Sequence, residues 1–367
     1  MKKRLWTFLL VALLGFFVQL GEATLAWSST AFVDPLDTPA AAIGGTLHPQ
    51  SQPMLAAARA GERIVAVGLR GTIVWSDDNG GKWHQASVPV QSDIVAVMFV
   101  DPQNGWASGH DGVILHTTDA GSHWTRQFDY RSEATTFANY YRTQPGASAT
   151  TLKPILDEIA LNTSNGASLP WLSVWFDDKS SGYAVGSFGM IARTQDGGKS
   201  WIPWFDHIDN DQFLNLNAIR RIGDQLYIAG EKGMVYRFDP KTQRFVGLST
   251  GYEGSLFDIV GDSHYLLAIG LRGRVFRSID QGATWVQVPS GTGATLTGAT
   301  RLIDGRIVLA SGDGALFESA DEGQTFHRFD VAQAAPLAGV TEGNRGDAVV
   351  YGYGGVRVRP NKSGRAD

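Results

Sequence analysis

Short apolar stretches separated by glycine-rich turns run through most of the chain. The first clear example is Ile64-Val65-Ala66-Val67, which a turn separates from Ile73-Val74. Apolar runs of this length, bounded by Gly, Asn and Asp, are typical of half-buried antiparallel strands. The first unit contains four of them, near residues 53–60, 62–68, 71–76 and 82–88. The pattern predicts an all-β protein.

A Gly-x-x-Gly turn after the second strand recurs along the chain. Most copies lie about 40 residues apart, which is the length of one β-propeller blade, and one interval is nearly twice as long. Seven copies predict a seven-bladed β-propeller with four-stranded antiparallel blades over residues 27–360, followed by a C-terminal tail at 361–367. The turns start at Gly68, Gly109, Gly186, Gly230, Gly270 and Gly352, with a shortened copy at Gly312.

The seventh unit is incomplete in the sequence. Inner strands are expected near 335–343, 346–351 and 354–359, but no fourth strand follows them. The segment 28–36 is apolar enough to supply it. We therefore expect the N-terminal strand to close the ring, which removes the open sheet edges.

A second motif, Ser/Thr-x-Asp-x-Gly-x-x-Trp, follows the third strand of most units. This is the Asp-box, or BNR, repeat. The Asp is expected to accept hydrogen bonds from backbone N–H groups of a tight turn, Gly to supply a positive φ, and the aromatic residue to pack between blades. These structural aspartates are Asp78, Asp119, Asp196, Asp280 and Asp321; the last box ends in Phe instead of Trp.

Up-and-down strand order sorts the turns onto two faces. The Gly-x-x-Gly turns share one face with the connections between blades, and the Asp boxes share the other. Three of the Gly-x-x-Gly turns carry a basic residue at the same position: Arg70, Lys232 and Arg272. They are either solvated turn residues or a basic patch that docks an acidic partner, and Asp111 and Asp313 at other turns dilute that patch.

An insertion at about 130–169 separates the second and third blades. Its first half is aromatic, and residues 151–161 are expected to form a short helix with Pro154 in the first turn. The insertion is either a docking arm for a partner or a lid that folds back on its own blades. Together with the basic turns, the candidate partner-binding residues are Phe188, Tyr140 and Tyr141.

The N-terminus has the order of a secretory signal peptide. A basic start at Lys2, Lys3 and Arg4 precedes an apolar run and a small-residue segment that ends at Ala26. We predict cleavage after Ala26, or else after Ala23, and a periplasmic or extracellular protein. The alternative is an uncleaved membrane anchor, for which the apolar run is short. The net charge of −5 argues against a general nucleic-acid binder. With 0 cysteines, disulfides, thiol catalysis and Cys-ligated metals are excluded.

The repeats resemble the single-propeller family of photosystem II stability and assembly factors and its exported bacterial relatives. The resemblance rests on the Gly-x-Arg-Gly turns at Gly68–Gly71 and Gly270–Gly273, each of which leads into an Asp box. It implies a non-catalytic, monomeric factor that binds a membrane or envelope protein and carries no cofactor or metal. It also implies that Arg70, Arg272 and, more weakly, Lys232 contact the partner.

An enzyme is the alternative, because Asp boxes also occur in sialidases and other glycosidases. A glycan-active enzyme or lectin of this kind needs convergent acids at the channel mouth. The candidates are Tyr252-Glu253 and the cluster Asp206, Asp209 and Asp211, which is otherwise a solvated loop or a Ca²⁺ site. The Arg-Ile-Pro motif typical of sialidases is absent, so no catalytic residue is assigned and a binding function is favoured.

Overall fold

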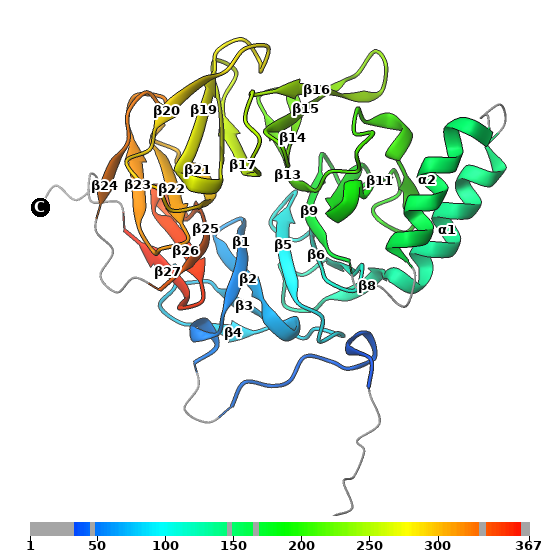
Figure 1. Ribbon diagram of the computed structural model, residues 1–367. Helices are drawn as coiled ribbons and strands as arrows, with labels where there is room; N and C mark the ends of the chain where they lie inside the picture. Colours follow the sequence, from blue (N-terminus) through cyan, green and yellow to red (C-terminus); the bar gives the residue numbers. More distant parts are fainter. Residues whose placement is uncertain (1–32, 45–47, 145–148, 164–168, 330–334, 361–367) are drawn as a thin grey trace, which may run out of the picture. The chain divides into compact units, whose positions relative to one another are not determined.

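The structure is a computed structural model that describes residues 33–44, 48–144, 149–163, 169–329 and 335–360. Within these residues, the unit that begins at Asp34 contains seven antiparallel sheets arranged as blades around a central channel (Figure 1). In each blade the strands follow chain order from the channel outward, and six of the seven sheets have four strands. The predicted seven-bladed propeller is confirmed.

The strands have the following bounds. Blade 1 contains β1 (Met54–Ala60), β2 (Arg63–Gly68), β3 (Ile73–Ser76) and β4 (His84–Gln85). Blade 2 contains β5 (Ile94–Phe99), β6 (Gly105–Gly109), β7 (Ile114–Thr117) and β8 (Thr125–Phe128). Blade 3 contains β9 (Trp171–Phe176), β10 (Gly182–Gly186), β11 (Ile191–Thr194) and β12 (Ile202–Pro203). Blade 4 contains β13 (Leu216–Ile222), β14 (Gln225–Gly230), β15 (Met234–Asp239) and β16 (Arg244–Ser249).

The remaining blades are built in the same way, except that the last one has three strands. Blade 5 contains β17 (Leu256–Gly261), β18 (Leu266–Gly270), β19 (Arg274–Ser278) and β20 (Val286–Pro289). Blade 6 contains β21 (Leu296–Arg301), β22 (Ile307–Ser311), β23 (Leu316–Ser319) and β24 (His327–Phe329). Blade 7 contains β25 (Leu337–Glu342), β26 (Ala348–Gly352) and β27 (Gly355–Arg359).

Close backbone contacts explain the two glycines of the Gly-x-x-Gly turns, which we call the tips. A Cβ atom on Gly68 would lie 2.1 Å from the carbonyl oxygen of Pro53, and one on Gly71 would lie 2.0 Å from that of Val90. Gly71 also has a φ of +71°, a conformation that disfavours other residues. The first glycine therefore lets β1 pass, and the second lets the chain cross to the next blade.

Side-chain hydrogen bonds close the Asp-box turns. In blade 1 the Ser76 hydroxyl donates to Asp78 Oδ1 at 2.8 Å, and the Lys82 N–H donates to the same oxygen at 2.7 Å. The hydroxyl-to-carboxylate bond recurs in the other four boxes at 2.7–2.9 Å. The aromatic residue reaches the preceding blade, since Trp83 packs with Val349 and Val356 of blade 7. Each box thus caps a turn and joins two blades.

The prediction that segment 28–36 closes the ring as a strand is wrong for residues 33–36. Residues 28–32 lie outside the described residues. Asp34 precedes a one-turn 3-10 helix, η1 (Pro35–Asp37), instead of joining blade 7. The physical reason is that Arg131 holds Asp34 and Asp37 at 2.5 and 2.8 Å, beside blades 1 and 2. Leu36 is also buried in the core cluster that these two blades share.

Direct contacts between blades 1 and 7 close the ring instead. The Asn344 side chain donates to the Glu62 carbonyl at 2.7 Å, and the Asn79 side chain donates to Asp347 at 2.7 Å. The 3-10 helix η2 (Pro49–Ser51) packs on β27, the outermost strand of blade 7. Packing and hydrogen bonds therefore join the two ends of the propeller without a shared sheet.

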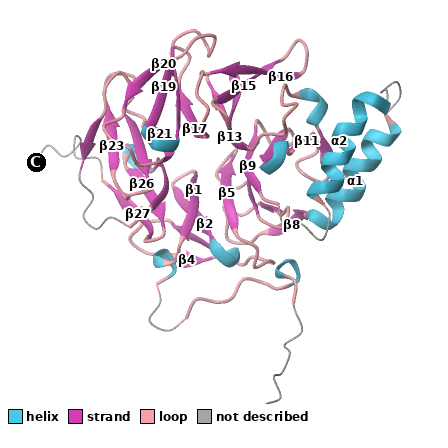
Figure 2. Cartoon of the chain, viewed as in Figure 1, coloured by secondary structure: helices cyan, strands magenta, loops and turns pink. Residues whose placement is uncertain are grey.

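The insertion forms two helices, α1 (Tyr130–Thr143) and α2 (Ala149–Asn162). Figure 2 shows them together beside a ring built almost entirely of strands. They lie at the outer rim of blades 2 and 3, and α1 packs on β12. Both halves are helical, whereas the sequence predicted a helix only in the second half. No helix in the described ranges is long and apolar enough to cross a membrane.

Candidate partner-binding face

The tips present one residue each to solvent on the face that we call the tip face. In five tips the third residue has a positive φ, between 50° and 59°, although it is not glycine. This left-handed conformation tightens the turn and directs the side chain away from the blade. These residues are Arg70, Asp111, Phe188, Lys232 and Arg272.

The three basic tip residues are exposed and carry charges that no acid neutralises. Within the described residues, no ion pair involves Arg70, Lys232 or Arg272. The Lys232 ammonium donates to the neutral Gln212 side chain at 2.6 Å. The Arg70 backbone N–H, not its guanidinium, donates to Asp93 at 2.7 Å. All three cations can therefore contact a partner.

Several arginines near the Asp-box face, the opposite one, are already paired. Arg63 binds Asp77 at 2.6 Å, and Arg221 binds Asp177 at 2.6 Å. Pairing of this kind neutralises the positive charge and holds the guanidinium in the fold. The tip cations, in contrast to these paired arginines, are free to pair with an acidic partner.

Local hydrogen bonds engage the acidic tip residues. The Ser92 hydroxyl donates to Asp111 at 2.6 Å, and the Ser311 hydroxyl donates to Asp313. Glu231, next to Lys232, accepts from the backbone N–H of Asn215 at 2.9 Å. These carboxylates stabilise the turns they sit in. They lower the net positive charge of the face, but they do not pair with the basic tips.

Exposed aromatic rings accompany the cations. Phe188 is 49% exposed and the tip residue Tyr353 is 64% exposed. Tyr140 is half-buried on α1. Tyr141 is only 1% exposed and donates to Asp206 at 2.8 Å. The prediction of Tyr141 as a partner-binding residue is therefore corrected: in this conformation it packs inside the protein, and Phe188 and Tyr140 remain candidates.

The inner face of α1 anchors the insertion to its own blades. Phe137 and Tyr141 belong to the core cluster of blade 3, where Phe137 contacts Trp171 edge-on. Glu133, one turn earlier, is 4% exposed, and burial raises its pKa to about 8. The insertion is thus folded back on its blades, as in the second of the two alternatives, and it lies at the rim instead of over the channel.

The acidic cluster predicted as a candidate site is divided among separate contacts. Asp206 accepts from Tyr141, while Asp209 pairs with Arg244 at 2.9 Å. No group of three or more metal-ligating side chains is found in the part of the chain that the structure describes. The Tyr252 hydroxyl donates to the Leu271 carbonyl at 3.2 Å. None of these groups converges with another acid at the channel mouth.

A collar of side chains around the channel mouth had no signal in the sequence. In every blade the register between the first two strands shifts at one residue near the start of the innermost strand, as a β-bulge does. A bulge redirects the extra residue, and all seven extra residues line one cavity of about 430 Å³. The collar consists of Leu55, Val95, Leu172, Asn217, Phe257, Thr297 and Ala338.

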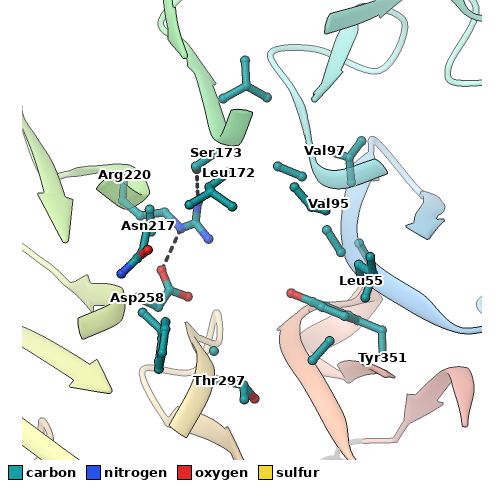
Figure 3. A pocket seen from close by; sticks show the side chains of 18 of the residues that line it. Leu55, Val95, Val97, Leu172, Ser173, Asn217, Arg220, Asp258, Thr297 and Tyr351 are labelled. Carbon is teal, nitrogen blue, oxygen red and sulfur yellow. Dashed lines mark hydrogen bonds and ion pairs between the residues drawn. The ribbon is translucent and has the colours of Figure 1, made fainter. Parts of the chain in front are cut away.

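Polar groups lie among the inner strands that surround this cavity. Figure 3 shows Arg220 reaching into the channel from one side and Tyr351 from the other. Arg220 Nε lies 3.2 Å from Asp258, whose side chain is 7% exposed. Asp258 is the only carboxylate that lines the cavity among the described residues. The paired acids that a glycosidase needs are therefore not found there.

Comparisons with known proteins agree with this architecture. The profile of the family described as "Photosynthesis system II assembly factor YCF48" matches residues 55–137 and 155–334, more than half of the chain. The chain belongs to this family. The YCF48 match skips residues 138–154, which are the end of α1 and the start of α2, so this part of the insertion departs from the family pattern.

Individual relatives are distant. The "Photosystem II assembly lipoprotein Ycf48" of Synechococcus sp. (strain CC9902) is 26% identical over 182 residues, which is 46% of this chain. The match spans about half, 54%, of that relative's length. A solved structure titled "YCF48 bound to D1 peptide" is 17% identical with a TM-score of 0.62, covering 88% of this chain and 100% of that one.

A second solved relative supports the same fold. YCF48 from Cyanidioschyzon merolae is 16% identical with a TM-score of 0.62, covering 87% of this chain and 98% of that one. A WD40 propeller domain of Doa1 reaches the same TM-score at 12% identity. At these identities the structural likeness establishes the propeller fold, and the family assignment rests on the sequence profile.

Proposed function

We propose that this chain is an exported, non-catalytic assembly factor that binds a segment of a membrane or envelope protein at its tip face. The observation that carries the proposal is the set of three exposed, unpaired cations at Arg70, Lys232 and Arg272. Exposed aromatic rings such as Phe188 lie in the same set of turns. Cations steer an acidic segment to the surface, and aromatic rings add contact area once it is bound.

The family supports a protein partner. Relatives in the YCF48 family are named as assembly factors, and one solved relative holds a D1 peptide. We extend from these names only the class of partner, a polypeptide segment of a membrane protein.

The alternative of a glycan-active enzyme has less support. The cavity at the tip face is lined by one carboxylate, and Asp258 already contacts Arg220 and two backbone N–H groups. Hydrolysis through paired acids requires a second carboxyl group across the substrate. The names of the relatives also describe assembly and not catalysis. Both observations favour a binding protein.

Export is proposed from the sequence, because residues 1–26 lie outside the described residues. The Synechococcus relative is named a lipoprotein. This sequence contains 0 cysteines, so it has no thiol to which a lipid could be attached. We propose that the protein is released by cleavage after Ala26 and works in the periplasm or outside the cell.

The experiment compares two charge-reversed proteins of equal net charge. The first carries Arg70→Glu and Arg272→Glu. The matched control carries Lys241→Glu and Arg345→Glu, which change exposed turn residues on the Asp-box face; Arg345 has a φ of 55°, like the tip residues. Tagged proteins are incubated with detergent-solubilised membranes of the native organism, and captured proteins are quantified by mass spectrometry.

We expect the tip variant to capture at least about tenfold less of the membrane protein than the wild type does, because like charges at a docking surface repel. The control variant should retain it. Both should unfold at the wild-type temperature, since all four side chains are exposed. Equal capture by the two variants, or capture lost only in the control, would contradict the proposal.

A further inference from the structure

The cavity below the collar has the size and lining of a small-ligand site. Its volume of about 430 Å³ lies in the range that such ligands occupy. Most collar side chains are apolar, including Leu55, Val95, Leu172 and Phe257. The innermost strands form this cavity, and the three basic tip residues do not line it.

Arg220 is held so that part of its guanidinium remains available. Its Nε lies 3.2 Å from Asp258, and its Nη1 donates to the Ile219 carbonyl at 3.2 Å and to the Ser173 hydroxyl at 3.5 Å. No hydrogen bond joins Nη2 to any described residue. The side chain is 41% exposed, although it sits inside the channel. A fixed donor therefore faces the cavity (Figure 3).

Asp258 fixes this arrangement and also removes its net charge. Its two oxygens accept from the backbone N–H groups of Ile259 at 3.0 Å and Ala299 at 3.2 Å. The carboxylate is thus held by two blades while it contacts Arg220. Because the pair is neutral as a unit, the site offers hydrogen-bond donors without a net positive charge. An anion would gain from Arg220 and lose beside Asp258.

Tyr351 supplies a second donor from the opposite side of the channel. It belongs to β26, the second strand of its blade, and it reaches the channel because Gly339 on β25 has no side chain. A Cβ atom on Gly339 would lie 2.5 Å from the Tyr351 hydroxyl oxygen. No described residue accepts from this hydroxyl, which lines the cavity with Arg220.

Asn217 adds an acceptor to these donors. Its amide nitrogen donates to the Leu256 carbonyl at 2.8 Å, which fixes the amide group. Its Oδ1 has no hydrogen bond with a described residue, and the side chain lines the same cavity. Two donors and one acceptor, next to apolar walls, match the carbonyl and N–H of an amide that carries an apolar group.

We propose that the channel mouth binds an uncharged amide with an apolar substituent. The amide carbonyl accepts from Arg220 Nη2 and the Tyr351 hydroxyl, and its N–H donates to Asn217 Oδ1. The apolar substituent occupies the collar. The same chemistry occurs in a small-molecule amide and in a peptide bond beside an apolar side chain, so the test uses one probe of each kind.

The probes are phenylacetamide and N-acetyl-leucine methylamide, titrated into the full chain by ligand-observed NMR. Phenylacetate, which has the same ring and a carboxylate in place of the amide, is the matched control. We expect saturable binding of at least one amide. Phenylacetate should bind at least about tenfold more weakly, because it would place an uncompensated charge beside Asp258.

Three variants locate the site. Tyr351→Phe removes one hydroxyl and should weaken binding about fivefold, the value of one neutral hydrogen bond. Ala338→Phe fills the collar and should abolish binding. The double variant Arg220→Gln with Asp258→Asn removes the charged pair together, so that no buried charge is left alone, and should weaken binding about tenfold.

The outcomes are distinguishable from failure of the partner-binding proposal. Arg272→Glu changes only the tip face and should leave amide binding unchanged. The inference is overturned if neither amide shows saturable binding, if phenylacetate binds as tightly as phenylacetamide, or if Tyr351→Phe and Ala338→Phe bind like the wild type.

Discussion

Replacing the buried Glu133 by Gln should make the protein more resistant to alkaline pH. Glu133 lies on α1, is 4% exposed, and makes no hydrogen bond or ion pair through its carboxyl group with the described residues. Burial raises its pKa from 4.5 to about 8, so the folded state holds a proton that the unfolded state releases near pH 4.5. The contribution of Glu133 to stability is therefore greatest below pH 4.5 and falls as the pH rises toward 8.

The size of the effect follows from the pKa difference. One pKa unit corresponds to about 1.36 kcal/mol, so the ionised carboxyl group disfavours the docked helix by up to about 5 kcal/mol. Glu133→Gln keeps the shape of the protonated side chain and cannot ionise. Its stability should therefore exceed that of the wild type by only about 1 kcal/mol at pH 5, and by several kcal/mol at pH 9.

Two measurements check this prediction. Urea unfolding from pH 5 to 9 gives the free energy of unfolding, and hydrogen exchange of the α1 amides, corrected for intrinsic rates, reports whether the helix opens before the blades do. The exposed Glu62→Gln serves as the control and should follow the wild-type curve. Parallel curves for wild type and Glu133→Gln would show that α1 does not bury this carboxyl group.

Three further substitutions test the packing of the blades. Gly233→Ala should lower the free energy of unfolding by about 3 kcal/mol or more, because its Cβ would lie 2.2 Å from a backbone carbonyl oxygen. Gly251 has a similar φ but open space around it, so Gly251→Ala should lower the free energy of unfolding by only about 1 kcal/mol. Equal losses in urea unfolding would refute the role of this contact. Trp106→Ala should lower the free energy of unfolding measured by calorimetry by about 3–5 kcal/mol, because Trp106 is 1% exposed and its ring centroid lies 3.6 Å from that of a ring in the next blade. A decrease below about 1 kcal/mol would contradict this packing. Hydrogen bonds from a threonine side chain and backbone lower the pKa of Asp280 to about 2, so its stabilising effect is present above pH 3.8 and lost as the pH falls toward 2. Asp280→Asn should therefore flatten the acid limb of stability between pH 4 and 2, and an unchanged slope would count against the turn contacts.

The blades could be predicted from the sequence because their motifs follow from backbone geometry. Gly68 and Gly71 are required where the chain passes another strand closely, so the requirement appears at every repeat. The helical insertion also had a signal, since Glu133, Phe137 and Tyr141 recur every four residues on one face of α1. That spacing indicated a buried face, and Tyr141 was assigned to the surface because the first half of the insertion was not recognised as a helix.

Long-range contacts decided what the sequence could not predict. The N-terminal segment joins blades 1 and 2 because Arg131, nearly a hundred positions away, pairs with Asp34. The collar depends on the register between two strands in each blade, and neither strand shows that register by itself. Arg220 and Asp258 likewise meet only when β13 and β17 become neighbours around the channel.

Site-specific photo-cross-linking tests most directly whether the tip face docks a membrane protein. A photo-reactive phenylalanine analogue replaces Phe188 on the tip face in one protein and Ile303 in another. Ile303 is 77% exposed in the turn between β21 and β22, on the Asp-box face. On irradiation with solubilised native membranes, position 188 should form an adduct with a membrane protein and position 303 should not. An adduct at 303 alone, or the same adduct at both positions, would contradict binding at the tip face.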